Sequence, residues 1–191
     1  GALRTVAGSL NKIANDLRLL ASGPRNGLGE LEQPENQPGS SIMPGKINPV
    51  VAESVNQVHK QVVGNDAAVN AGAVEGQLDL NLYKPVLAHN FLQSADLVAN
   101  ASETFAEKFV AKLEANEQHC EQQVERSMAL ATALNPAIGY DKASEAAKAA
   151  LKEGKTVKEV VVERGYLTAD EAEDVLDPEK MTHRGILSGD D

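Results

Sequence analysis

The stretch that decides the fold is LRTVAGSLNKIANDLRLL, residues 3–20. Its apolar residues recur every three or four positions, at Leu3, Val6, Leu10, Ile13, Leu17 and Leu20. This spacing places them on one side of an α-helix, in a stripe typical of helices that pack in bundles. The pattern predicts a long amphipathic helix that ends at the breaker Ser22-Gly23-Pro24.

Two further segments carry stripes of the same kind, and a loop over residues 76–83 separates them. The apolar positions are Val51, Val55, Val58, Val62, Val69 and Ala73 in the first segment, and Leu87, Phe91, Val98, Ala101, Phe105, Phe109 and Leu113 in the second. We expect the second of these helices to run from about residue 85 to 114. Long stripes of this length predict an antiparallel helix bundle. Small residues at 67, 68 and 71–73 favour close packing on several neighbours, including other subunits.

From about residue 117 the expected helices become short. Their ranges are 117–131, 139–153, 156–164 and 168–175. Thr168 followed by Glu171 has the pattern of a capping box. The sequence therefore predicts an all-α chain, with part of a central helix bundle over residues 1–116 and a small all-helical domain over residues 117–191.

Composition excludes several classes of partner. The formal net charge of −10 argues against binding to nucleic acid or to an anionic membrane surface, because both need clustered cations. A local cationic pocket could still take an anionic substrate. No apolar run is long enough to span a bilayer, so we expect a cytoplasmic protein. The acidity fits a high-salt habitat and an ordinary acidic cytosolic protein equally well.

The chemistry-bearing stretch is GSSIMPGKINP, residues 39–49. It lies within a Pro- and Gly-rich segment that predicts a long loop, with a disordered linker as the alternative. Asn48-Pro49 predicts a helix start, with Asn48 as the N-cap. The positive end of that helix and Lys46 together suit a carboxylate. An alternative remains open on spacing alone: turn chemistry, a solvated lysine, and a Glu53 that only complements the helix dipole. None of the four histidines has metal-ligand spacing, so no metal site is predicted.

The same run, with Glu53, resembles the signature of the fumarase/aspartase superfamily, G-S-S-x-M-P-x-K-x-N with a glutamate five residues after the asparagine. Every signature position is matched. The stretch TALNPAIGYDKA, residues 132–143, resembles class II fumarases in its Gly-Tyr-Asp-Lys-Ala portion, where aspartases diverge. The resemblance extends over nearly the whole chain.

This resemblance implies a chemistry and a set of roles. Class II fumarases hydrate fumarate reversibly and stereospecifically to L-malate in the citric acid cycle, without a metal or organic cofactor. Ser40, in its ionised form, would be the catalytic base, and Glu53 would orient a catalytic histidine. The residues that would bind the dicarboxylate are Ser41, Lys46, Ile47 and Asn48.

The resemblance also implies that the active site is incomplete in this chain alone. In the family, the catalytic histidine lies upstream, and each site is assembled from three subunits of a homotetramer. The sequence begins inside a helical pattern without Met, so we expect a carboxyl-terminal fragment that is inactive by itself. Two alternatives stand beside this hypothesis: an aspartate ammonia-lyase of the same superfamily, and a non-catalytic oligomerising helical module.

Overall fold

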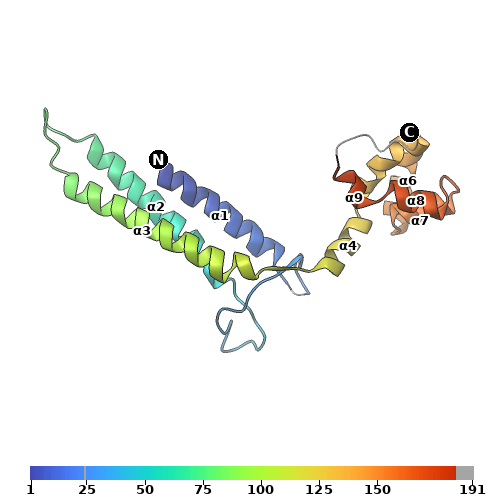
Figure 1. Ribbon diagram of the computed structural model, residues 1–191, viewed down its shortest axis with the longest axis horizontal. Coiled ribbons are helices and arrows are strands. Elements are labelled where there is room, and N and C mark those ends of the chain that lie inside the picture. Colours follow the sequence, from blue (N-terminus) through green and yellow to red (C-terminus); the bar gives the residue numbers. More distant parts are fainter. Residues whose placement is uncertain (24, 184–191) are drawn as a thin grey trace. The chain divides into compact units, whose positions relative to one another are not determined.

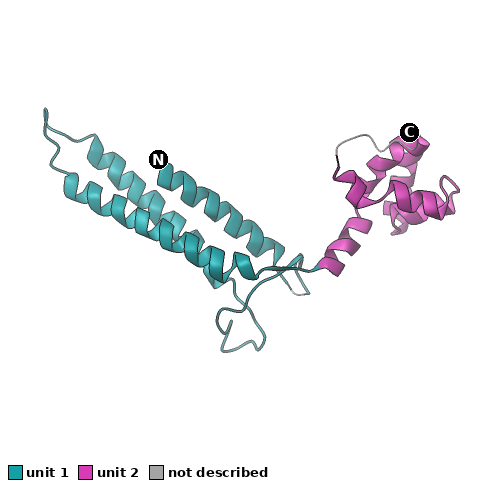
Figure 2. Cartoon of the chain, in the orientation of Figure 1, with its two compact units in different colours: residues 1–116 teal, residues 117–191 magenta. Residues whose placement is uncertain are grey.

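The computed structural model describes residues 1–23 and 25–183, and the chain divides into two compact units, residues 1–116 and 117–191 (Figure 2). The secondary structure of the described residues is almost entirely helical, so the predicted all-α fold class is confirmed. The predictions made for Pro24 and for residues 184–191 lie outside the described residues.

Unit 1 is built on three long helices that lie side by side (Figure 1). They are α1 (Ala2–Leu20), α2 (Val50–Ala73) and α3 (Lys84–Lys108). Arg4, early in α1, bonds Asp66, late in α2, and the α2 residue Asn65 bonds Ser94 of α3 at 3.1 Å. Neighbouring helices are therefore antiparallel, as the stripes predicted.

Small side chains let α1 and α2 approach closely. Ala14 and Ala52 are both fully buried, and they share a core with the stacked rings of Phe105 and Phe109. Leu10 and Leu17 of the predicted α1 stripe pack against this core. The outer edge of the α1 stripe stays uncovered, because three helices enclose only part of it: Val6 and Ile13 are 48% and 47% exposed. Phe91 of the α3 stripe is likewise 56% exposed.

The predicted extension of the third helix to residue 114 is wrong. The backbone leaves the helix at Phe109, whose φ and ψ are −125° and −66°, and a 3₁₀ turn, η1 (Val110–Lys112), follows. Strand β2 (Glu114–Ala115) then pairs antiparallel with β1 (Leu31–Glu32). The turn places the Phe109 ring in the core and returns the chain to the segment between α1 and α2, where Asn116 N donates to Glu30 O at 2.9 Å.

Unit 2 is made of short helices around a core of valine, leucine and alanine. The elements are α4 (Glu117–Glu125), η2 (Met128–Leu134), α5 (Asn135–Ile138), α6 (Tyr140–Glu153), α7 (Val157–Glu163), α8 (Ala169–Val175) and α9 (Pro178–Met181). Leu134, Val157 and Ala146 are fully buried in this core. The predicted single helix over 117–131 is wrong, because Ser127 accepts the N–H of Ala129 and starts η2 instead.

Two capping boxes define the starts of α7 and α8. The predicted pair Thr168 and Glu171 is confirmed: the threonine hydroxyl accepts the Glu171 N–H, and the glutamate accepts the Thr168 N–H at 2.8 Å. Thr156 and Glu159 form a second box of the same design, which the sequence analysis did not single out. Each box satisfies two backbone donors that a helix start leaves open.

Lowering the pH is expected to loosen both capped helix starts. The backbone hydrogen bond from Thr156 holds the pKa of Glu159 below its ordinary value, and Thr168 does the same for the pKa of Glu171. A carboxyl whose pKa is lower in the folded state stabilises the fold fully above its unfolded pKa, about 4.3. That contribution is lost as the pH falls through the folded pKa.

Hydrogen exchange followed by mass spectrometry checks this expectation. After correction for the intrinsic exchange rate, amides of α7 and α8 should exchange faster at about pH 3 than at about pH 6. Thr156→Ala is the matched control, because it should weaken α7 by about 1 kcal/mol at either pH and leave α8 unchanged. Equal protection of both helices at the two pH values would contradict the role given to these boxes.

Candidate active site in the serine loop

Residues 39–48, here called the serine loop, form a closed loop immediately before α2. At its base, Asn48 Nδ2 donates to the carbonyl oxygen of Gly39 at 2.5 Å. The backbone of Lys46 lies so close to Gly39 that a Cβ at position 39 would be 1.7 Å from the Lys46 carbonyl oxygen. The two ends of the loop are therefore held together, and only glycine fits at position 39.

The start of α2 differs from the prediction. The helix begins at Val50, its N-cap is Pro49, and no side chain caps it. Asn48 was expected to be the N-cap, but its amide is bonded to Gly39 and closes the loop instead. The predicted helix start is thus displaced by one residue, and the N–H of Val50 at its first position donates to Asn48 O at 2.8 Å.

Ser40 lies just inside the closed base, with its hydroxyl turned back toward the loop. Its Oγ accepts the N–H groups of Ile42 and Met43, each at 3.1 Å. Such bonds are common in serine turns. They also place two N–H dipoles on one oxygen atom, an arrangement that favours a negative charge there. Ser40 is half-buried, whereas Ser41 is exposed and Ile42 is 87% exposed, so the rest of the loop faces solvent.

Lys46 and Ile47 line a cleft of about 460 Å³ at the base of the loop. Glu32, Gln33 and Asn116 also line this cleft. A cleft of this size suits a small molecule. Within the described part of the chain, the Lys46 ammonium has no ion-pair partner, so its charge is available to an anion in this cleft.

Glu53 lies in the first turn of α2, and its partner is Arg18 near the end of α1. Glu53 Oε1 is 3.5 Å from Arg18 Nη2, and the two side chains are 40% and 35% exposed. Neither Glu53 nor Lys46 hydrogen-bonds Ser40 in the described structure. The structure thus brings together Gly39, Lys46 and Asn48 at the loop base and sets Glu53 against Arg18.

Arg18 is the neighbour of the site that the sequence analysis missed. A signal for it exists, because Glu53 and Asn56 are three residues apart on one helix face and can share a single guanidinium. Using that signal requires the register of α1 against α2, which the stripes do not supply.

The described residues show neither a metal-binding cluster nor a membrane-spanning helix. Among the described residues, no group of three or more His, Cys, Asp or Glu side chains is placed to hold a metal ion. None of the helices in residues 1–23 and 25–183 is both long and apolar enough to cross a membrane.

Comparison with known proteins finds a matching family model in each unit. The family described as Lyase matches residues 1–64, and the family described as Fumarase C C-terminus matches residues 130–183. A fumarate hydratase class II from Halobacterium salinarum is 88% identical over 174 residues, which cover 91% of this chain and 37% of that protein.

Two solved structures share the fold at high similarity. A fumarate lyase:delta crystallin from Brucella melitensis, bound to cobalt, superposes with a TM-score of 0.91 at 52% identity, covering 95% of this chain and 39% of that one. A class II fumarase from Schistosoma mansoni superposes with a TM-score of 0.86 at 38% identity, covering 96% of this chain and 39% of that one. The chain thus spans about two-fifths of the length of the relatives it matches.

The helix bundle, the serine loop and these matches define the chain as part of a lyase of the fumarase/aspartase superfamily. The resemblance read from the signature is confirmed. Within this superfamily, the chain belongs to the class II fumarate hydratase family and corresponds to the carboxyl-terminal part of its members.

Proposed function

We propose that this chain supplies the serine loop of a fumarate hydratase, which adds water reversibly and stereospecifically to fumarate to give L-malate in the citric acid cycle. The observation that carries this proposal is the Ser40 hydroxyl, which accepts two backbone N–H groups inside a loop closed by Asn48 and Gly39. This arrangement suits a serine that must carry negative charge while it removes a proton.

The reaction explains why such a serine is useful. In the dehydration direction, a base removes a weakly acidic proton beside a carboxylate of malate, and negative charge builds up on that carboxylate. Ser40, ionised, takes the proton, and the N–H groups of Ile42 and Met43 stabilise its alkoxide before transfer. Glu53 orients a histidine from another part of the enzyme, which acts with water as the second acid/base group.

The remaining residues of the site bind the dicarboxylate. Lys46 supplies the full positive charge, and Asn48 and the Ile47 backbone supply hydrogen bonds to the same carboxylate. Ser41, exposed at the loop surface, bonds the substrate. Asn48 thereby acts twice, since its Nδ2 also closes the loop.

We further propose a cytoplasmic homotetramer in which subunits share active sites. The uncovered edge of the apolar stripes supports this assembly, because Val6 and Ile13 on α1 and Phe91 on α3 are half-exposed on otherwise well-packed helices. Half-exposed apolar stripes of this length are typical of helices that pack against further helices. Residues 1–116 are accordingly part of the central bundle domain, and residues 117–191 are the small carboxyl-terminal domain.

A hybrid enzyme tests the proposed function. The matching part of this chain replaces the corresponding segment of the Halobacterium salinarum relative, and fumarate consumption is followed by absorbance beside the unaltered relative. We expect the hybrid to hydrate fumarate at a comparable rate, and the 191-residue chain alone to be inactive. A folded, tetrameric hybrid without hydratase activity would refute the proposal, and release of ammonia from aspartate by it would favour the aspartate ammonia-lyase.

Lys46→Met in this hybrid is expected to raise the KM for fumarate at least tenfold, with a smaller change in kcat. The reason is the loss of a charge-assisted hydrogen bond to a carboxylate, which is made in the substrate complex as well as in the transition state. Steady-state kinetics measures both constants. Lys12→Met, an exposed lysine of α1 that pairs with Asp16 on the same helix, is the control and should leave KM unchanged. An unaltered KM in the Lys46 variant would remove that residue from the binding site.

A further inference from the structure

Arg18 occupies an unusual position between the helices and the serine loop. Its guanidinium reaches from α1 to two α2 residues, with Nη1 donating to Asn56 Oδ1 at 2.9 Å and Nη2 lying 3.5 Å from Glu53 Oε1. It also lines a cleft of about 390 Å³ together with Ile47 and Pro49, the residues that join the serine loop to α2.

The Arg18 guanidinium is held by Asn56, which is itself held by α1. Asn56 is buried, and its amide donates to Asn11 at two atoms, the backbone oxygen at 3.2 Å and Oδ1 at 3.0 Å. Lys60 Nζ donates to the same Asn11 Oδ1 at 2.7 Å. A chain of hydrogen bonds thus runs along the α1–α2 contact and ends at the Arg18–Glu53 pair.

The arrangement does not maximise the bonding of Arg18. Its Nε is buried and has no hydrogen-bond partner in the described structure, whereas its two terminal nitrogens face Asn56 and Glu53. A buried donor without a partner is unfavourable for stability. The guanidinium therefore contacts Asn56 and Glu53 while one of its own N–H groups, on Nε, stays without a hydrogen bond.

We propose that Arg18 is a positioning residue for the hydration, and this inference rests on the proposed function. Arg18 holds Oε1 of Glu53, so that Oε2 is left to accept a hydrogen bond from the catalytic histidine. In the described structure Oε2 has no hydrogen-bond partner. A planar guanidinium that is itself held by Asn56 limits the positions that the carboxylate can take.

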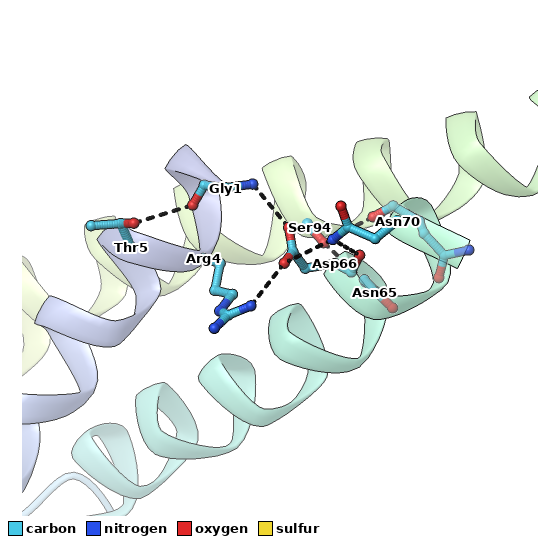
Figure 3. A network of polar contacts seen from close by, with 8 residues as sticks. Gly1, Arg4, Thr5, Asn65, Asp66, Asn70 and Ser94 are labelled. Carbon is cyan, nitrogen blue, oxygen red and sulfur yellow. Dashed lines mark hydrogen bonds and ion pairs between the residues drawn. The ribbon is translucent and has the colours of Figure 1, made fainter. Parts of the chain in front are cut away.

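The chain contains a matched control pair for this idea. Arg4 on α1 bonds Asp66 on α2, with Nη1 3.2 Å from Oδ2 (Figure 3). This pair joins the same two helices as the Arg18–Glu53 pair. It lies 14 residues earlier in α1, roughly 21 Å along the helix axis from Arg18.

The test compares Arg18→Met with Arg4→Met in the hybrid enzyme. We expect Arg18→Met to lower kcat by about 10- to 100-fold while KM changes less than about threefold, because a displaced catalytic group affects the reaction more than substrate binding. Arg4→Met should keep kcat within about twofold, since it removes a pair that only joins the helices. Arg18→Lys should recover part of the lost kcat, because it restores the charge without the planar fork.

A double-variant cycle separates positioning from a general structural role. If Arg18 acts through Glu53, then Arg18→Met should cause no further loss of kcat in a Glu53→Gln background. The inference would be overturned if the kcat losses of the two single variants multiplied in the double variant. An Arg18→Met enzyme with a lower melting temperature but an unchanged kcat would also overturn it. If Arg18→Met does not assemble, Arg18→Lys decides, and wild-type kcat in that variant overturns the role.

The outcome also separates the two proposals. An assembled but inactive unsubstituted hybrid overturns the proposed function and the positioning role with it. An active hybrid in which Arg18→Met behaves like Arg4→Met overturns the positioning role alone.

Discussion

Replacing Ser40 by alanine in the hybrid enzyme is expected to lower kcat about a thousandfold. The change removes the only atom on this residue that can take a proton, and general-base catalysis by a positioned side chain contributes typically 10²–10⁴-fold. It leaves the N–H groups of Ile42 and Met43 without their acceptor, but both residues are exposed and water can replace the hydroxyl. The assembly state of the hybrid and its thermal midpoint should therefore be unchanged.

Steady-state kinetics and native mass spectrometry check these two halves of the Ser40 prediction. Ser41→Ala is the matched control, because it removes the neighbouring hydroxyl, which makes no hydrogen bond within the described structure. The kcat of Ser41→Ala should fall by only about tenfold, which is the effect of losing one hydrogen bond to the substrate. Wild-type turnover in Ser40→Ala would show that another group is the base.

Gly39→Ala is expected to lower kcat about a hundredfold, although it adds a single methyl group. The new Cβ would lie 1.7 Å from the Lys46 carbonyl oxygen and 2.4 Å from its carbonyl carbon, so the base of the loop must open. Opening breaks the bond from Asn48 to Gly39 and displaces Ser40 from its site. A displacement of about 1 Å at a catalytic group can cost 10²-fold in rate.

Gly45→Ala provides the comparison for Gly39→Ala within the same loop. A Cβ at Gly45 would meet nothing within 4 Å, and the cost comes only from the φ of +76° at that residue. Since a left-handed conformation costs a non-glycine residue about 1–2 kcal/mol, we expect less than tenfold loss of kcat. Equal losses in the two variants would mean that loop flexibility, and not closure of the base, controls the rate.

The helical fold was readable from the sequence because apolar spacing reports helix faces directly. The same spacing did not show how much of each face is covered. Leu10 and Leu17 pack inward, while Val6 and Ile13 in the same stripe stay half-exposed, because coverage depends on how many helices surround α1. The end of α3 was missed for a related reason, since residues 109–113 continue the helical spacing but leave the helix to let β2 pair with β1.

For the candidate site, too, the sequence identified the residues but not the contacts between them. Residues 39–49 and Glu53 were identifiable because a long, specific pattern marks them. Two contacts that define their geometry were not: the Asn48–Gly39 bond needs the loop to close on itself, and the Arg18–Glu53 pair needs the register of two antiparallel helices. The box at Thr156 and Glu159 could have been found, since it repeats the spacing recognised at Thr168 and Glu171.

The closed base of the serine loop has a consequence for how such enzymes can diverge. The bond from Asn48 to Gly39 makes residues 40–47 a nearly self-contained insert, attached to the bundle at one place. Most side chains in this insert face solvent and none belongs to the buried core, so we expect mutations there to alter the proposed reaction with little penalty to folding. Changes of substrate can then arise through mutations in one short segment while the helices stay the same. The same helical scaffold could in this way support several related elimination reactions.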